Sequence, residues 1–444
     1  MRDPDASIRF EAAQVVRSLV APLVNGHFLR SDLARRWVAD RRLVDFAMPD
    51  PLSITSPRVP FVTHPFEWCD AQLFSAAQLS LGLQREAVDT GYDLKDASAW
   101  NVIFDGTRPI FCDLLSFLPL KDRRWWAMGQ YARHFLLPLL VSRRRGLYGH
   151  QSFSVWRDGL PPTVARRLLG PTVFMTRYGP LLFGQSNPVR AHSAVQRPPE
   201  ASGGSAASFR SGLHTALDWM LAGVTPPASS RRSVPGWSGY EDDRPHYTGE
   251  SLSKKRATIG EWLTRIRPKW VADFGCNTGE FSKLAAEQGA HVVALDADHE
   301  SIQQLYRTSA PHWHLYPVVV PLDDIGSGRG WAGTEHPGLA QRLHDRFDVV
   351  MMLALIHHLA VGASIPLSAV AEFARACTRD WTIVEFVDEA DPQLTSLCAQ
   401  RQRTGGEFSA ARQRAAFVDA GFHVEAEVDL FPAKRTLVLL RKNS

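Results

Sequence analysis

The sequence predicts an α/β fold for the C-terminal half of the chain and a mixed α+β domain in front of it. Three observations in the C-terminal half support this prediction: β-rich runs alternate with helical ones, the first run ends in a glycine-containing turn, and the second ends in an acid. Strand and helix in alternation are typical of a parallel sheet with helices on both faces. A length of 444 residues is too great for one ordinary core and favours two or three domains.

Seven short runs of apolar and β-branched residues predict the strands of this sheet. They are Trp270–Phe274, His291–Leu295, Leu315–Val320, Asp348–Leu353, Trp381–Phe386, Val424–Asp429 and Thr436–Leu440. Helical patterns fall between the earlier runs, as at Glu280–Gln288 and Leu367–Cys377. The last two runs follow each other through Phe431, Pro432 and Ala433 without a helix, so we expect them to form a closing antiparallel hairpin.

The N-terminal region shows a mixed pattern. Helical segments are predicted over Arg9–Val24 and Ala71–Thr90. A strand, a turn and a second strand are predicted over Asn101–Leu114, with Asp105 and Gly106 at the turn. Aromatic and apolar residues are frequent enough here for a separate core.

Composition divides the chain into a domain over residues 1–189, a linker over residues 190–250 and a second domain over residues 251–444. The linker is rich in Pro, Gly and Ser, which is typical of a flexible connection, and one short helix is expected inside it at Leu213–Leu221. Tyr240 and Tyr247 near its end are expected either to cover a ligand in the second domain or to anchor the linker.

Composition also limits the class of protein. Apolar residues make up 45% and charged residues 22%, a balance that excludes a wholly disordered or fibrous chain. No stretch approaches eighteen apolar residues, so we expect no membrane span. Five scattered cysteines without a CxxC pair argue against a zinc ribbon and a disulfide framework, and favour the cytoplasm. No metal site is expected.

Positive charge is concentrated in the N-terminal half. The first 190 residues hold 24 Lys and Arg against 17 Asp and Glu, a net charge of +7, whereas the whole chain carries +4. Such clusters are found in proteins that bind nucleic acid or a phosphorylated partner. Solvated helix faces are the alternative interpretation, and no aromatic-basic RNA-binding motif accompanies the clusters.

The most informative segment is the turn after the first predicted strand of the C-terminal half. Gly275 and Gly279 permit a tight turn and a close approach of the backbone to a ligand. Asp296 stands at the tip of the next strand, where a carboxylate can accept hydrogen bonds from ribose hydroxyls. A dinucleotide site is disfavoured because the GxGxxG pattern is absent.

This segment, Asp-Phe-Gly-Cys-Asn-Thr-Gly, resembles motif I of the class I S-adenosylmethionine-dependent methyltransferases, and Asp348–Leu359 is similar to their fourth-strand motif. The resemblance covers roughly residues 250–444 and implies a Rossmann-like, seven-stranded methyltransferase sheet. It implies that S-adenosyl-L-methionine is the cofactor and that Asp296 binds its ribose. Asp324, or alternatively Asp323, is expected at the adenine. The remaining cofactor-binding residues implied are Asp273, Gly275, Cys276, Asn277 and Gly279.

Candidate catalytic residues lie at the ends of the fourth and fifth strands. His357 and His358 end the fourth strand, and a histidine there can take a proton from a hydroxyl or amine nucleophile. Packing against the sheet is the alternative role for either histidine. Glu385 or Asp388 at the end of the fifth strand is expected to hold a cationic or hydroxylated acceptor, although Asp388 and Asp391 are equally suited to helix capping.

The N-terminal half has a second candidate site. Asp96, Asn101 and Asp113 have the order and spacing of the base and metal ligands of protein kinases. This half therefore resembles a degenerate kinase-like catalytic lobe, without a glycine-rich loop or a lysine strand for the nucleotide. The wider chain resembles a group of two-part bacterial methyltransferase-like proteins, some associated with nodulation, on the segments His64–Trp68 and Leu94–Asn101.

The sequence thus predicts a methyltransferase that acts on an oxygen or nitrogen nucleophile of an unidentified acceptor, a small molecule in preference to RNA or protein. Two alternatives remain open. One is a phosphotransferase that uses Asp96, Asn101 and Asp113. The other is a regulatory protein that binds S-adenosylmethionine without methylating anything. The sequence does not indicate an oligomeric state.

Overall fold

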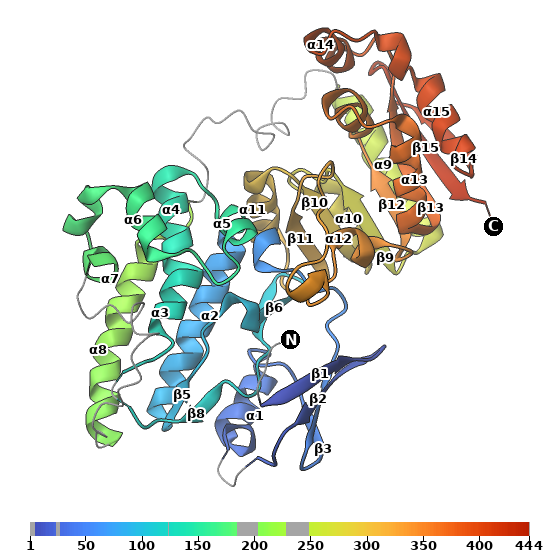
Figure 1. Cartoon of the computed structure of the whole chain (residues 1–444). Coiled ribbons are helices and arrows are strands. Elements are labelled where there is room, and N and C mark those ends of the chain that lie inside the picture. Colours follow the sequence, from blue (N-terminus) through green and yellow to red (C-terminus); the bar gives the residue numbers. More distant parts are fainter. Residues whose placement is uncertain (1–4, 24–26, 123, 184–202, 228–247, 444) are drawn as a thin grey trace. The chain divides into compact units, whose positions relative to one another are not determined.

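The computed structural model describes residues 5–23, 27–122, 124–183, 203–227 and 248–443 (Figure 1). The chain divides into two compact units, Met1–Ser229 and Ser230–Ser444. Within the described residues, no helix is both long enough and apolar enough to cross a lipid bilayer.

The C-terminal unit is built on one seven-stranded sheet with the order β11-β10-β9-β12-β13-β15-β14. Its strands are β9 (Trp270–Phe274), β10 (His291–Asp296), β11 (Leu315–Val319), β12 (Phe347–Met352), β13 (Thr378–Val387), β14 (Phe422–Asp429) and β15 (Arg435–Lys442). Strands β9 to β13 are parallel, and β15 is antiparallel to both of its neighbours. The α/β prediction, the seven strands and the closing antiparallel hairpin are therefore confirmed.

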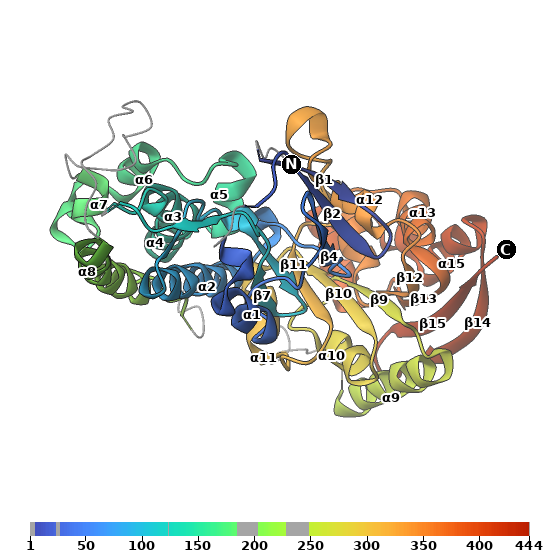
Figure 2. The same ribbon diagram turned by 90° about the horizontal axis from the view of Figure 1, so that it is seen from below.

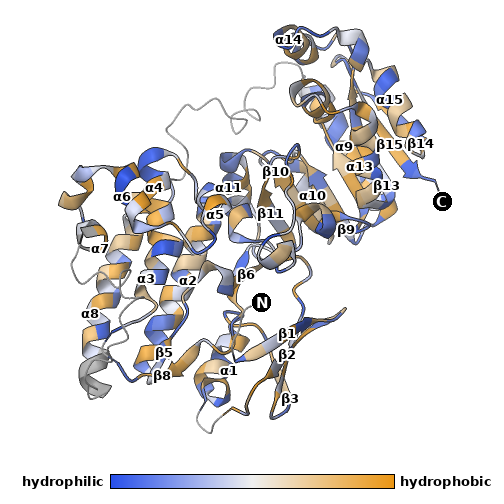
Figure 3. Ribbon diagram, viewed as in Figure 1, coloured by the Kyte–Doolittle hydropathy of each residue, from blue (hydrophilic) through white to orange (hydrophobic). Residues whose placement is uncertain are grey.

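Helices cover both faces of this sheet. Figure 2 shows α9 (Gly249–Ile266), α10 (Glu280–Glu287) and α11 (His299–Thr308) on one face, and α13 (Leu367–Cys377) and α15 (Ala410–Asp419) on the other. Two short helices, α12 (Leu339–Leu343) and α14 (Pro392–Gln400), complete the unit. Because both faces are covered, the central strands are apolar along their length, as the hydropathy colours of Figure 3 show.

The order of the strands fixes where a ligand can bind. The chain starts in the middle of the sheet at β9, moves outward to β11, and returns to β12 on the other side of β9. The loops after β9 and β12 consequently leave the sheet toward opposite faces and open a crevice between them. Open α/β sheets bind ligands at such a switch point, outside the carboxyl ends of the strands.

The N-terminal unit combines a small antiparallel sheet with a group of helices. The sheet has the order β1-β2-β4-β3, and two hairpin-like pairs, β5 with β8 and β6 with β7, lie outside it. Its strands are β1 (Ala6–Phe10), β2 (Gln14–Leu19), β3 (Ala47–Asp50), β4 (Ser53–Pro57), β5 (Tyr92–Leu94), β6 (Val102–Asp105), β7 (Arg108–Phe111) and β8 (Phe117–Pro119). Its helices are α1 (Asp32–Ala39), α2 (Asp70–Asp89), α3 (Met128–Tyr131), α4 (Leu137–Arg145), α5 (Gly149–Val155), α6 (Pro162–Leu169), α7 (Gly179–Phe183) and α8 (Gly203–Ala222).

The predicted helix over Arg9–Val24 is wrong. This segment contains the end of β1 and all of β2, which pair as an antiparallel hairpin. Strand β2 also pairs with β4, where Arg17 lies opposite Ile54. Pairing with a distant strand therefore overrides the local helical pattern. The predicted helix over Ala71–Thr90 and the hairpin around Gly106, whose φ is +64°, are confirmed.

The predicted linker contains a long helix. Residues 203–222 form α8, which packs along α2, instead of the short helix expected at Leu213–Leu221. Arg210 holds it there: the guanidinium is fully buried and donates to both carboxylate oxygens of Asp93 at 2.7 and 2.8 Å. Tyr240 and Tyr247 lie outside the described residues.

Candidate active site

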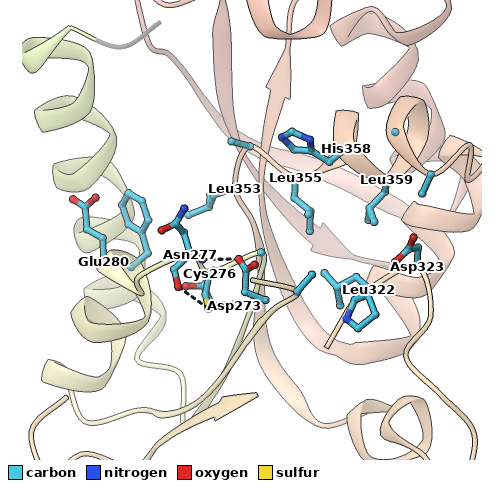
Figure 4. A pocket seen from close by; sticks show the side chains of 18 of the residues that line it. Asp273, Cys276, Asn277, Glu280, Leu322, Asp323, Leu353, Leu355, His358 and Leu359 are labelled. Atoms are coloured by element: carbon cyan, nitrogen blue, oxygen red, sulfur yellow. Dashed lines mark hydrogen bonds between the residues drawn. The ribbon is translucent and has the colours of Figure 1, made fainter. Parts of the chain in front are cut away.

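A cavity of about 360 Å³ opens at the carboxyl ends of β9, β10 and β12 (Figure 4). Figure 4 shows Asp273 and Asn277 on one side and His358 and Leu359 on the other, with Leu355 between them. This is the crevice that the strand order creates. The volume lies within the range of small-molecule sites.

The turn after β9 approaches the cavity with its backbone. Gly275 has a φ of +72°, Asn277 a φ of +51° and Gly279, at the start of α10, a φ of +81°. A Cβ at Gly275 would lie 2.9 Å from Cδ1 of Leu355, which packs against this turn. Gly275, Cys276 and Asn277 line the cavity, whereas Gly279 lies outside its lining and serves the turn.

Asp296 joins this turn to the end of β10. The backbone N–H of Asn277 donates to Oδ2 of Asp296, and the N–H of Asp298 donates to Oδ1, both at 2.8 Å. The carboxylate is therefore held by one hydrogen bond on each oxygen and still faces the cavity, where further lone pairs can accept. Burial raises the pKa of Asp296.

Asp273 is the buried acid of the site. It is 2% exposed, lines the cavity, and accepts a hydrogen bond from the Ser282 hydroxyl at 2.5 Å. Burial raises the pKa of Asp273 to about 6, although the Ser282 hydrogen bond and the nearby Lys255 act in the opposite direction. A cationic group placed beside it would favour the ionised carboxylate.

The expectation for Asp324 needs correction. Asp323, which was the alternative, lines the cavity together with Pro321 and Leu322, and Asp324 does not. The chain turns here, because the N–H of Asp324 donates to the carbonyl oxygen of Pro321 at 3.1 Å. That turn takes Asp324 away from the cavity lining.

The two histidines after β12 have different environments. His358 lines the cavity at the start of a π-helical turn, His358–Gly362. His357 is 1% exposed and lies outside the lining, with its ring centroid 4.1 Å from that of His358. Burial, and then the charge of Arg435, lowers the pKa of His358 to about 4, so its ring is neutral near pH 7. The structure thus brings His358 to the site but not His357.

Glu385 cannot contact an acceptor, contrary to expectation. It is fully buried on β13 and does not line the cavity. Oε2 lies 2.5 Å from Nζ of Lys255, and Oε1 lies 3.4 Å from Nη1 of Arg435. The two cations explain how a carboxylate is tolerated inside the sheet.

Capping explains the acids that follow Glu385. Oδ1 of Asp391 accepts from the N–H groups of Gln393 and Leu394 at the start of α14, and Oδ2 lies 2.9 Å from Nε of Arg435. Oδ1 of Asp388 accepts from the N–H of Ala390 at 2.9 Å. Both side chains are therefore used in the loop before α14.

Two basic residues of the cavity lining, Lys255 and Arg401, were missed from the sequence. A signal for Lys255 existed: it lies on the same face of α9 as Ile259 and Trp262, so a charge interrupts an apolar stripe. The adjacent Lys254 concealed it, because a pair of lysines on a helix is typical of a solvated face. Arg401, just after α14, has no comparable signal.

The kinase-like residues of the N-terminal unit come together. Burial raises the pKa of Asp96, and the negative charge of the nearby Asp113 raises it further. Nδ2 of Asn101 donates to the Asp96 carbonyl oxygen at 3.1 Å. Arg17 of β2 pairs with Asp113, with 2.9 Å between Nη1 and Oδ1. The kinase resemblance stays a prediction, and the described residues hold no group of three or more His, Cys, Asp or Glu that could bind a metal.

Comparison with known proteins agrees with the geometry of the C-terminal unit. Residues 245–427 match the family model described as a methyltransferase domain. The C-terminal unit is a class I S-adenosylmethionine-dependent methyltransferase. The wall of the methyltransferase cavity fits its cofactor, because the backbone of the glycine turn lines it at Gly275 and Asp296 presents a carboxylate at a strand end.

A curated relative of the methyltransferase extends over both units. The chain is 27% identical to the nodulation protein NoeA of Rhizobium meliloti (strain 1021) over 426 residues, which is 90% of this chain and 87% of the relative. The similarity therefore includes the N-terminal unit as well as the methyltransferase domain.

Solved structures also match part of the chain. Magnesium protoporphyrin IX methyltransferase from Synechocystis PCC 6803, with bound SAH, is 16% identical and covers 44% of this chain and 84% of its own, with a TM-score of 0.33. The N-methyltransferase NodS from Bradyrhizobium japonicum WM9 is 11% identical and covers 46% of this chain and 99% of its own, with a TM-score of 0.32.

Proposed function

We propose that the methyltransferase unit transfers the methyl group to an oxygen or nitrogen nucleophile that enters the cavity beside His358. The observation behind this proposal is the arrangement of the cavity in Figure 4: Asp273 and Asn277 of the glycine turn lie on one side, and the neutral imidazole of His358 with Leu359 lies on the other. The first side suits the cofactor and the second suits an acceptor.

The cofactor side divides further by chemistry. Asp296 is proposed to accept hydrogen bonds from the ribose hydroxyls, and Leu322 and Asp323 to contact the adenine. Asp273 and the backbone around Gly275 are proposed to surround the methionine portion. The sulfonium supplies an activated methyl group, so the protein mainly aligns the nucleophile and excludes water.

His358 is proposed to orient the nucleophile. Its ring is neutral near pH 7 because its pKa is about 4, and a neutral imidazole can accept a hydrogen bond from a hydroxyl or an N–H. The same low pKa makes the imidazole a weak base. We therefore assign it the role of orienting the nucleophile's lone pair, in preference to the role of abstracting a proton. Glu385 has no direct part in this step, since it is buried between Lys255 and Arg435.

The acceptor is proposed to be a small molecule, in preference to RNA or protein. Leu355 and Leu359 lie near His358 and make this part of the wall largely apolar, which suits a compact organic substrate. The relative NoeA is called a nodulation protein, and we infer that the acceptor belongs to the same process.

Calorimetric titration tests this function. The intact protein should bind S-adenosylmethionine in the micromolar range, about −8 kcal/mol. A screen of acceptors with methyl-labelled cofactor should then give a labelled product that is lost in Asp296→Ala. Absence of cofactor binding would overturn the proposal, and binding without turnover on any acceptor would favour a regulatory protein.

A phosphotransferase in the N-terminal unit is the second candidate function. Convergence of Asp96, Asn101 and Asp113 favours it, whereas the ion pair between Arg17 and Asp113 opposes it by engaging the carboxylate that would bind the metal. A parallel titration with Mg-ATP separates the two functions. Binding of Mg-ATP that is lost in Asp113→Ala would support the second candidate.

The cytoplasm is the proposed compartment. All five cysteines are thiols outside any disulfide bond, and three of the side chains, Cys69, Cys377 and Cys398, are almost entirely buried. Thiols outside disulfide bonds are typical of a reducing compartment.

A further inference from the structure

Lys255 is a buried cation in the wall of the cofactor cavity. It is 4% exposed, and its Nζ lies 5.0 Å from the centre of the Phe281 ring, which also lines the cavity. Its charge acts on Asp273 and lowers the pKa of that carboxyl, against the larger effect of burial. Lys255 therefore lies at the end of the cavity formed by the turn after β9.

The charges of the wall single out this residue. Among the described residues that line the cavity, the acids are Asp273, Glu280, Asp296 and Asp323. The only lysine or arginine side chains in that lining are Lys255 and Arg401. Arg401 is exposed and follows α14. The buried residues of α14 pack against the turn that begins with His358. Lys255 is thus the cation near Asp273.

We propose that Lys255 binds the carboxylate of the methionine portion of the cofactor, and that Glu385 positions Lys255 for this contact. The inference rests on the proposed placement of the methionine portion beside Asp273. A carboxylate at this end of the cavity meets Asp273 as a like charge, so it needs a cation within reach. Asp273 in turn suits the ammonium group of the same amino acid.

Three further buried side chains hold Lys255 in place. An ammonium in an apolar site tends to lose its proton unless a counter-ion is present, and the carboxylate of Glu385, 2.5 Å from Nζ, is that counter-ion. Glu385 is itself held by Arg435, and Arg435 by Asp391. Two cations and two anions alternate in this buried chain, so it is neutral overall and fixes the ammonium in place.

Binding of three nucleosides to the intact protein tests the proposal. The probes are S-adenosylhomocysteine, its decarboxylated analogue, which keeps the ammonium but lacks the carboxylate, and 5′-methylthioadenosine, which lacks both. Lys255→Met should weaken binding of S-adenosylhomocysteine by about tenfold to a hundredfold. It should leave the two other nucleosides unchanged. Lys254→Met is the matched control, because Lys254 is the exposed neighbour on α9 and should affect none of the probes.

The role of Glu385 needs its own variant. Glu385→Gln should lower the preference for S-adenosylhomocysteine over its decarboxylated analogue, and should have no such effect when Lys255 is already Met. An additive effect of the two substitutions would overturn the positioning role.

The outcomes distinguish this inference from the proposed function. If Lys255→Met weakens all three nucleosides equally, the lysine supports the fold and the carboxylate contact is wrong. If 5′-methylthioadenosine binds and the preference for the carboxylate survives in Lys255→Met, only this inference fails. If none of the nucleosides binds the natural sequence, the proposed function fails with it.

Discussion

The backbone N–H of Asn277 donates to Oδ2 of Asp296 at 2.8 Å, so the turn after β9 and the tip of β10 form one rigid corner. The carboxylate is already aligned before a ribose arrives. Little ordering of the corner is then required on binding, which is how a pre-formed site gains affinity.

Asp296→Ala should weaken binding of S-adenosylhomocysteine by about 1.5–3 kcal/mol, the range for hydrogen bonds to a charged group. Isothermal titration calorimetry measures the change. Asp380→Ala is the control, because Asp380 is exposed on β13 and lies outside the cavity lining. Equal affinities of Asp296→Ala and Asp380→Ala would contradict the placement of the ribose.

Cofactor binding should strengthen with pH because of Asp273. In the cofactor-free protein this carboxyl has a pKa of about 6, and the ammonium of a bound cofactor favours its ionised form. Binding therefore releases a proton, and affinity should rise about tenfold between about pH 5 and about pH 7. Titrations in buffers of different ionisation enthalpy detect the proton. Asp273→Asn should bind the cofactor more weakly and lose the pH dependence of affinity. If the pH dependence is retained in Asp273→Asn, a group other than Asp273 causes it.

The same shift has a consequence for folding. A carboxyl whose pKa is raised in the folded state destabilises the fold as pH rises from its ordinary value of 3.8 to about 6. Asp273→Asn should therefore gain stability relative to the natural sequence as pH rises through this window. Thermal unfolding of both proteins at the two ends of the window provides the comparison.

Gly275→Ala should separate backbone strain from cofactor binding. Alanine at a φ of +72° costs about 1–2 kcal/mol, and its Cβ would also clash with the side chain of Leu355, which packs against this turn. Gly289→Ala is the matched control: its φ is +91°, but nothing lies within 4 Å of the added Cβ. Gly289→Ala should lose stability through the backbone alone, Gly275→Ala should lose more because of the clash with Leu355, and only Gly275→Ala should lose affinity for S-adenosylhomocysteine. Unchanged affinity in Gly275→Ala would indicate that the cofactor does not approach this backbone.

Arg210→Met should loosen α8 from α2. Breaking a buried ion pair costs about 3–5 kcal/mol, because Asp93 keeps its charge without its partner. Arg85→Met is the control. Arg85 of α2 pairs with Asp218 of α8 at the protein surface, so loss of this ion pair should cost less than about 1 kcal/mol. Amide hydrogen exchange within Gly203–Ala222 measures both changes. Equal effects of the two variants would show that burial of Arg210 does not increase the contribution of its ion pair to the stability of α8.

Most of the C-terminal unit could be predicted from the sequence because its signals are local. Each parallel strand is an apolar run of its own, and the glycine turn, Asn277 and Asp296 lie within about 25 residues of one another, the length of one strand-helix-strand unit. The choice between Asp323 and Asp324 is also local, because it depends on the turn in which the N–H of Asp324 donates to the carbonyl oxygen of Pro321. Two adjacent aspartates do not reveal from the sequence which side chain that turn directs into the cavity.

The failures depend on distant partners. Strand β2 was mistaken for a helix because it lies between β1 and β4 in the sheet, and β4 comes more than thirty residues later. The full length of helix α8 was missed because Asp93, which anchors Arg210, is 117 residues away. Glu385 was expected at the acceptor because Lys255 is 130 residues earlier in the chain. In each case the local pattern was ambiguous and a tertiary contact decided the structure.

Cys276 gives the cofactor cavity a chemical reporter of its own. Burial raises the pKa of Cys112 and Cys377 to about 12 and also raises that of Cys398, so these thiols react slowly with alkylating reagents near neutral pH. Cys276 lies in the cavity lining, where a bound nucleoside would shield it from a small maleimide. The rate of its alkylation can therefore report occupancy of the site before any acceptor has been identified.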